Sequence, residues 1–191
     1  HFRARAQIAD LEGDDRFVVM DVRGDLQALD IEQLNEDLAQ GDVFFEGNPF
    51  VGEVLQTHPA LADVNRLSVF MSPLSREEIQ MLRSQPSVSL QDLVTDVMRR
   101  KLLRRTRRQK GELSQKDLEN IEVRASSAYS ELKKAHQFQH VIPNHDGEDS
   151  ENWDAFYYPI GDARRALNAF VSLLAGKTTE DIESWDESLL P

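Results

Sequence analysis

One short segment of the chain holds an unusual concentration of positive charge. Eight of the twelve residues from 99 to 110 are Arg or Lys, and none is acidic. Guanidinium groups at this density could close over nucleotide phosphates and neutralise the charge of a phosphoryl group in transfer. A further arginine, Arg124, follows, and then a short apolar stretch that ends near Asn144. This order is typical of a phosphate-closing lid beside a pocket for a nucleotide base.

A solvated helix face paired with nearby carboxylates is the commoner explanation of a basic run. The overall charge bears on the choice, because the 191 residues include 22 basic and 34 acidic ones, for a net charge of −12. Outside residues 99–110 the balance is 14 against 34, or −20. A cationic island in an anionic protein attracts a small polyanion and repels a long one. We therefore expect nucleotide ligands and disfavour a nucleic acid.

Other chemistry-bearing residues are weaker signals. Glu46 follows the apolar run at residues 43–45, and an apolar strand that ends in an acid is the shape of a metal-organising strand. His136 and His140 are four apart, but a break expected between them disfavours a metal site. An aromatic group stands close to an acidic loop, and we expect it to pack as a plug more than to stack on a base. Its members are Trp153, Phe156, Tyr157 and Tyr158.

The elements that must position these residues alternate between strand and helix. We predict a hairpin between residues 2–9 and 16–22 and helices over 31–39, 51–55 and 163–174. Further helices begin at Ser75, Ser89 and Ser114, each of which has an acidic residue three positions later. The predicted parallel strands are residues 43–45, 67–71 and 140–142. A polar loop over residues 144–152 follows the last strand, and the acidic tail from Thr178 is expected to fray or to dock loosely.

Parallel strands of this kind predict an α/β fold, a parallel sheet flanked by helices. Ligands bind beyond the carboxyl ends of such strands. Three polar residues fall there in the sequence, namely Glu46, Ser72 and Asn144. The topology therefore predicts that they share one crevice.

The segment from Arg124 to Asn144 fits, without a gap, the spacing of the guanylate kinase branch of the nucleoside monophosphate kinases. Residues 42–48 resemble that family's strand D-V-L-L-E/D-I-D, and residues 67–79 resemble its next strand and helix. The resemblance covers roughly residues 40–175. It implies a P-loop-kinase-like three-layer core with a small β-rich acceptor lobe and a helical lid.

The resemblance also implies roles for individual residues. The catalytic lid arginines would be Arg104, Arg107, Arg108 and Arg124. The acceptor would be bound by Arg3, Arg5, Glu46 and Asn48. Asn144 and Asp146 would lie beside the base of ATP, and Glu46 would reach Mg²⁺ through water. The chain would then be one domain, with the acceptor lobe at 1–40, the core at 41–98 and 136–176, the lid at 99–135 and the tail at 177–191.

Several departures keep the function open. The phosphate-cradling motif G-x-x-x-x-G-K-S/T does not occur in the sequence, nor does the family's Tyr-Gly-Thr-Pro segment. The lid is longer than usual, and residues 147–158 look like an insertion. The first hypothesis is an ATP–Mg²⁺-dependent phosphotransferase acting on a nucleoside monophosphate or related phosphate. The second is a catalytically inactive module that binds an acidic or phosphorylated partner, and the third is a nucleic-acid binder that uses residues 99–110 alone.

Composition sets the remaining bounds. The chain has no Cys, which excludes disulfides and thiolate metal sites and fits a reducing compartment. No apolar run approaches the roughly 18 residues of a membrane span, and no signal peptide is recognisable at the start. We therefore expect a cytoplasmic protein with no membrane contact, and leave a homodimer open.

Overall fold

The chain divides into two compact units. The computed structural model describes residues 4–147 and 150–190, and the chain folds as residues 1–66 (unit 1) and residues 67–191 (unit 2). The mixed α/β class is confirmed, since helices accompany one antiparallel and one parallel sheet of two strands each. The assignment of all 191 residues to one kinase-like domain stays a prediction.

Unit 1 is built around a β-hairpin. Its elements are α1 (Arg5–Ala9), β1 (Phe17–Val22), β2 (Asp25–Asp30), α2 (Ile31–Gln40), α3 (Pro49–Thr57) and the short η1 (Pro59–Leu61). The hairpin turns at Arg23 and Gly24, whose φ angles are 58° and 88°, as a two-residue type I′ loop requires. The prediction that residues 2–9 pair with 16–22 is therefore wrong, because β1 pairs with β2 and α1 occupies residues 5–9.

The strand predicted at residues 43–45 does not form. This run lies in irregular chain between Gly41, which follows α2, and Asn48, which caps α3. Phe44 is 76% exposed. A three-residue apolar run becomes a strand only when a neighbouring strand pairs with its backbone, and the described residues of unit 1 offer only the hairpin, whose two strands pair with each other. The helix predicted over 51–55 is confirmed as α3.

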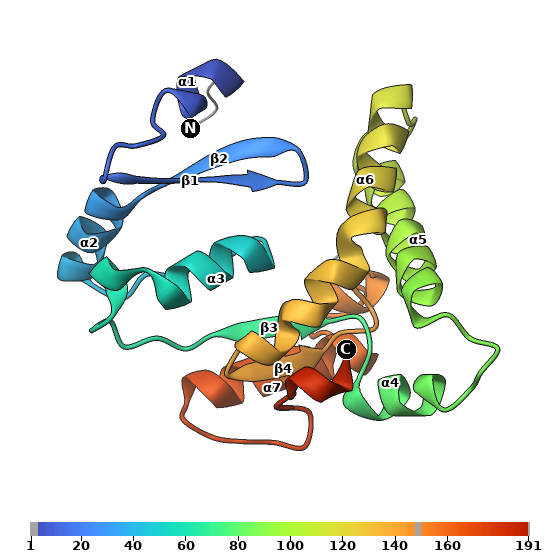
Figure 1. Ribbon diagram of the computed structural model, residues 1–191. Helices are drawn as coiled ribbons and strands as arrows, with labels where there is room; N and C mark the ends of the chain where they lie inside the picture. The colour runs from blue at the N-terminus through green and yellow to red at the C-terminus, as the bar shows by residue number, and fades with distance from the viewer. Residues whose placement is uncertain (1–3, 148–149, 191) are drawn as a thin grey trace. The chain divides into compact units, whose positions relative to one another are not determined.

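Unit 2 contains the parallel sheet. β3 (Val69–Ser72) pairs with β4 (His140–Pro143), and Phe70 lies opposite Val141. The helices are α4 (Arg76–Arg83), α5 (Leu90–Lys110), α6 (Gln115–Leu132) and α7 (Gly161–Leu174), with short turns η2 (Lys133–Gln137), η3 (Glu151–Trp153) and η4 (Glu187–Leu189). Helices α5 and α6 run side by side as a hairpin (Figure 1). All three predicted serine caps are confirmed, because each side chain accepts a hydrogen bond from the backbone of the acidic residue three positions on.

The sheet of unit 2 is covered on both faces. Val141 and Ile142 are both fully buried although they are consecutive, because side chains alternate between the faces of a strand. Val141 belongs to a cluster with Leu132 of α6, whereas Ile142 packs with Ala166 of α7 and its neighbours. A third cluster joins α5 to α6 around Leu102, Ile121 and Ala125. These contacts fix α5 and the end of β4 in one folded body.

The acidic tail is part of the core of unit 2. Glu183 forms an antiparallel bridge with Val141, and Trp185, Leu189 and Leu190 are each 5% exposed. All three belong to the same cluster as Val141. The expectation of a frayed or loosely docked tail is therefore wrong, because these apolar side chains outweigh the preference of the acidic residues around them for water.

Candidate functional site

The carboxyl ends of the two parallel strands meet in unit 2. The backbone N–H of Asn144 donates to the carbonyl of Ser72 at 2.7 Å. Ser72 is 1% exposed, and its hydroxyl donates to the carbonyl of Leu74 and accepts from the Leu74 N–H. Ser72 therefore shapes the turn after β3. Asn144 leads from β4 into the loop that follows that strand.

Helix α5 brings its cations to this loop. Lys101 Nζ donates to the carbonyl of Asn144 at 3.0 Å, and Arg108 Nη2 donates to Asp154 Oδ2 at 2.8 Å. Arg104 is three residues after Lys101 and four before Arg108, so it lies on the same helix face. Its side chain is exposed. We call this face of α5, together with residues 144–147 and 150–154, the α5–β4 site.

Asp146 organises the loop. Its Oδ1 accepts hydrogen bonds from Asn152 Nδ2 at 2.8 Å and Ser150 Oγ at 3.1 Å, and its Oδ2 accepts from the Ala163 N–H at 2.7 Å. Burial raises the pKa of this carboxyl group, but the three hydrogen bonds outweigh burial and hold the pKa below its ordinary value. Both oxygens are engaged in shaping the loop, and the prediction that Asp146 also lies beside a base stays a prediction.

Asn144 is likewise held in place. Its Oδ1 accepts from the backbone N–H of Gly147 at 3.2 Å, which closes a turn typical of Asn after a strand. Its carbonyl receives Lys101, so a cation of α5 and the end of β4 are joined across 43 residues of sequence. The predicted base-binding role of Asn144 is untested, but its place at the strand end beside the basic helix is established.

We did not predict a cluster of one histidine, His145, with two carboxylates at the same strand end. His145 Nε2 lies 2.7 Å from Glu78 Oε2, and its Nδ1 lies 3.3 Å from Asp162 Oδ2. Burial raises the pKa of Glu78, but hydrogen bonds from Ser75 and His145 hold it below its ordinary value. The signal that could have drawn attention to His145 is its position between Asn144 and Asp146. The cluster ties the loop to the first turns of α4 and α7.

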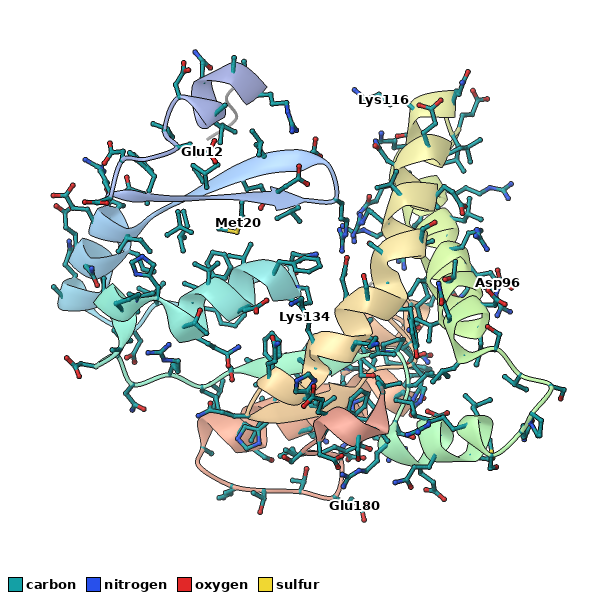
Figure 2. The ribbon with its side chains drawn as sticks, viewed as in Figure 1. Glu12, Met20, Asp96, Lys116, Lys134 and Glu180 are labelled. Carbon is teal, nitrogen blue, oxygen red and sulfur yellow. The ribbon has the colours of Figure 1, made fainter. Side chains whose placement is uncertain are left out.

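Much of the basic run is paired with carboxylates. Arg99 donates two hydrogen bonds to Glu122 of α6, which raise the pKa of its guanidinium, and it also contacts Asp96 of its own helix. Figure 2 labels Asp96 on α5. Lys110 contacts Asp117, the residue that completes the capping box of α6. The commoner explanation, a helix face paired with acids, therefore describes this part of the run.

The other predicted catalytic arginines are exposed. Arg107 lies in the last turn of α5, where its carbonyl accepts from Gly111 N–H at 2.8 Å. Arg124 lies on α6, and its carbonyl accepts from Ser127 Oγ at 3.1 Å. The structure thus brings Arg104 and Arg108 to the α5–β4 site and places Arg107 and Arg124 on the same helical hairpin. The catalytic roles of all four stay predictions.

The predicted acceptor residues belong to unit 1. Arg3 lies outside the described residues. Arg5 Nη1 donates to the carbonyl of Gly24, and its other nitrogen lies 3.6 Å from Asp21, so it fastens α1 to the hairpin turn. Glu46 is exposed in irregular chain, and Asn48 Oδ1 accepts from the Phe50 N–H at 2.9 Å as the cap of α3. Each of these three therefore has a local setting within unit 1, and the roles in acceptor binding stay predictions.

Unit 1 also has an open groove of about 700 Å³. Its lining includes Arg16, but that guanidinium forms hydrogen bonds with Asp30 and an ion pair with Glu32. Three of the other six lining residues are acidic and none is basic; the six are Asp15, Ile31, Glu32, Asn35, Glu36 and Ala39. A groove of this charge is a poor receptor for phosphates. The α5–β4 site is the better candidate for an anionic ligand.

The described residues hold no group of three or more His, Asp or Glu side chains that could bind a metal ion. Within the described ranges, none of the helices combines the length and apolar character that crossing a bilayer requires. Comparison with models of known families, with curated proteins and with solved structures finds no match. What the α5–β4 site can do follows from its geometry, which offers several cations on one helix face beside a half-buried, hydrogen-bonded turn.

Proposed function

We propose that this chain is a nucleotide-binding phosphotransferase of the guanylate kinase type, which transfers a phosphoryl group from ATP to a nucleoside monophosphate or related phosphate. The observation that carries the proposal is the contact between α5 and the end of β4, where Lys101 reaches Asn144 and Arg108 reaches Asp154. Open α/β sheets bind ligands in the crevice beyond the carboxyl ends of their strands, and the basic helix α5 contacts the chain at such an end.

The proposed roles follow from charge and position. Arg104 and Arg108, with Arg107 and Arg124 from the same hairpin, neutralise the phosphate oxygens as charge spreads in the transition state. The turn at Asn144 and Asp146 supports the donor base. The family resemblance implies that Arg3, Arg5, Glu46 and Asn48 hold the acceptor.

Magnesium enters this proposal as part of the Mg²⁺–ATP substrate. Glu78 and Asp146 follow the two strand ends in the chain, and both carboxylates are engaged in hydrogen bonds with protein groups. Glu46 is a single carboxylate in irregular chain of unit 1. The described side chains therefore provide no ready magnesium site, and no protein ligand to the ion is assigned.

A second candidate is a binding module without catalysis, which takes an acidic or phosphorylated protein. It is favoured by the carboxylates that α5 already holds in this structure, Glu122 on Arg99 and Asp154 on Arg108. A helix that pairs with carboxylates of its own chain would pair with those of a partner. The two candidates share a surface but differ in whether nucleotide is consumed.

Titration calorimetry with Mg²⁺–ATP, followed by a phosphoryl-transfer assay with a panel of nucleoside monophosphates, tests the proposal. Arg107→Ala should lower turnover at least tenfold and weaken acceptor binding much less, because the guanidinium acts mainly on the transition state. Arg164→Ala, which removes an exposed cation from α7, is the matched control. Equal turnover in Arg107→Ala and the parent protein would contradict the catalytic assignment. Binding of an acidic peptide without binding of Mg²⁺–ATP would favour the module.

A further inference from the structure

Three consecutive aromatic side chains protrude from the loop that precedes α7. Phe156, Tyr157 and Tyr158 are 68%, 91% and 67% exposed. The expectation that they pack as a plug is therefore wrong for these three. Trp153 alone is half-buried, and its Nε1 donates to the carbonyl of Gly147 at 2.6 Å. Folding gains little from side chains this exposed, and contiguous exposed apolar groups of this kind mark binding surfaces.

The loop that carries these rings is fastened on both sides. Before the rings, Asn152 donates to Asp146, and Asp154 accepts from Arg108 of α5. After the rings, the backbone N–H of Ile160 donates to the carbonyl of Asn152 at 2.9 Å. Tyr157 and Tyr158 meet edge to face, with their ring centres 4.8 Å apart. The rings are thus presented from a closed loop rather than from a loose end.

The contact of Asp154 with Arg108 attaches the loop that carries the rings to the basic helix α5. Tyr157 is three residues from Asp154, so the backbones of the two residues are at most about 10 Å apart. Asp154 in turn touches Arg108, and Arg104 lies one helical turn away on the same face of α5. A ligand that combines a flat ring with several negative charges matches this pairing. Because the protein carries a net charge of −12, a short polyanion is favoured over a long one.

We propose that Tyr157 and Tyr158 form a stacking platform for the base of a nucleotide whose phosphates lie on Arg104 and Arg108. The inference rests on the proposed function and adds the residues that recognise the base. Aromatic rings stack on any base through its flat face, so the platform favours nucleotides over inorganic phosphates without selecting one base. The phosphates displace Asp154 from Arg108, which costs little because that ion pair is exposed. The hydrogen bonds of Asn152 with Asp146 and of Ile160 with Asn152 still hold the loop after this displacement.

Titration calorimetry of the full chain with Mg²⁺–ATP and with Mg²⁺–tripolyphosphate tests the platform. The parent protein should bind ATP about tenfold or more tightly than tripolyphosphate, since stacking one base corresponds to roughly a five- to 150-fold gain. The double variant Tyr157→Ser, Tyr158→Ser should lose this preference and keep its affinity for tripolyphosphate. The double variant Tyr157→Phe, Tyr158→Phe keeps both rings and should retain the preference. Circular dichroism checks that each variant is folded.

The outcomes separate this inference from the proposed function. If neither compound binds the parent protein, the nucleotide proposal fails and the platform fails with it. If ATP binds more tightly than tripolyphosphate in the parent protein and equally so in the serine variant, nucleotide binding stands and the platform is refuted. The rings would then be a surface for a protein partner. A loss of ATP preference in the phenylalanine variant would also refute stacking, because the rings are retained.

Discussion

Replacing Asp146 by Ala should destabilise unit 2 by about 3 kcal/mol. Helix α7 begins after Ile160, which cannot cap it with a side chain, and Asp146 supplies the missing acceptor to Ala163 from 17 residues upstream. Ala163 and Ser150 are buried, so the substitution leaves their donors far from water. A buried donor without a partner costs roughly 1–3 kcal/mol, and loss of a helix cap costs about 1 kcal/mol.

The assay is urea unfolding followed by tryptophan fluorescence. Both tryptophans of the chain, Trp153 and Trp185, belong to unit 2, so the signal reports on that unit. The urea concentration at the midpoint of unfolding should fall, and the slope of the unfolding free energy against urea concentration should stay the same. This combination indicates a change in stability alone. Asp154→Asn is the matched control on the same loop, because its carboxylate forms one exposed ion pair worth at most about 1 kcal/mol.

The pH dependence gives an independent check through Asp146→Asn. The pKa of Asp146 is lowered in the folded protein, so the carboxylate stabilises the fold above the pKa of the unfolded chain, about 3.9, and that contribution disappears as the pH falls through the folded value. The difference in unfolding free energy between the parent and Asp146→Asn should therefore be largest near neutral pH and shrink below about pH 4. If Asp146→Ala is no more destabilising than Asp154→Asn at pH 7, the reasoning is refuted.

Two further substitutions test the core and the helical hairpin. Trp185→Ala should lower the unfolding free energy by about 3–5 kcal/mol in urea titrations, because Trp185 is buried against Phe70 and its neighbours. A loss below about 1 kcal/mol would mean that the tail is not docked. Ser114→Ala should cost about 1 kcal/mol in the same measurement, because the Ser114 hydroxyl caps α6, and Ser130→Ala, in the last turn of that helix, should cost less.

Helix starts could be predicted from the sequence because their causes are local. Ser75, Ser89 and Ser114 each bond to a backbone group three residues away, and that geometry does not depend on the rest of the fold. The strands were harder, because a strand exists only with its partner. Residues 69–72 pair with residues 140–143, which follow the α5–α6 hairpin in the chain. The equally apolar run at 43–45 has no strand partner among the described residues.

The candidate site could be predicted only in outline. The rule that ligands bind at the carboxyl ends of parallel strands pointed to Asn144, and the charge pattern pointed to α5. No local pattern predicts that Lys101 meets the carbonyl of Asn144, since that contact depends on how α5 packs over Ile121 and Ala125. The exposure of Tyr157 was also beyond sequence reasoning, because aromatic rings near a loop are more often buried.

Ion pairs with carboxylates explain how the basic helix α5 can be stable and still be available to a ligand. Eight cations in twelve residues would repel one another along a bare helix. Glu122, Asp154 and Asp117 each contact one of them, which reduces this repulsion. The partners on Arg99 and Arg108 are largely exposed, and exposed ion pairs are weak and screened by salt, so a ligand with several negative charges can replace them. Under the proposed function, the same carboxylates would hold the arginines in place before a ligand binds and would be replaced by the ligand on binding.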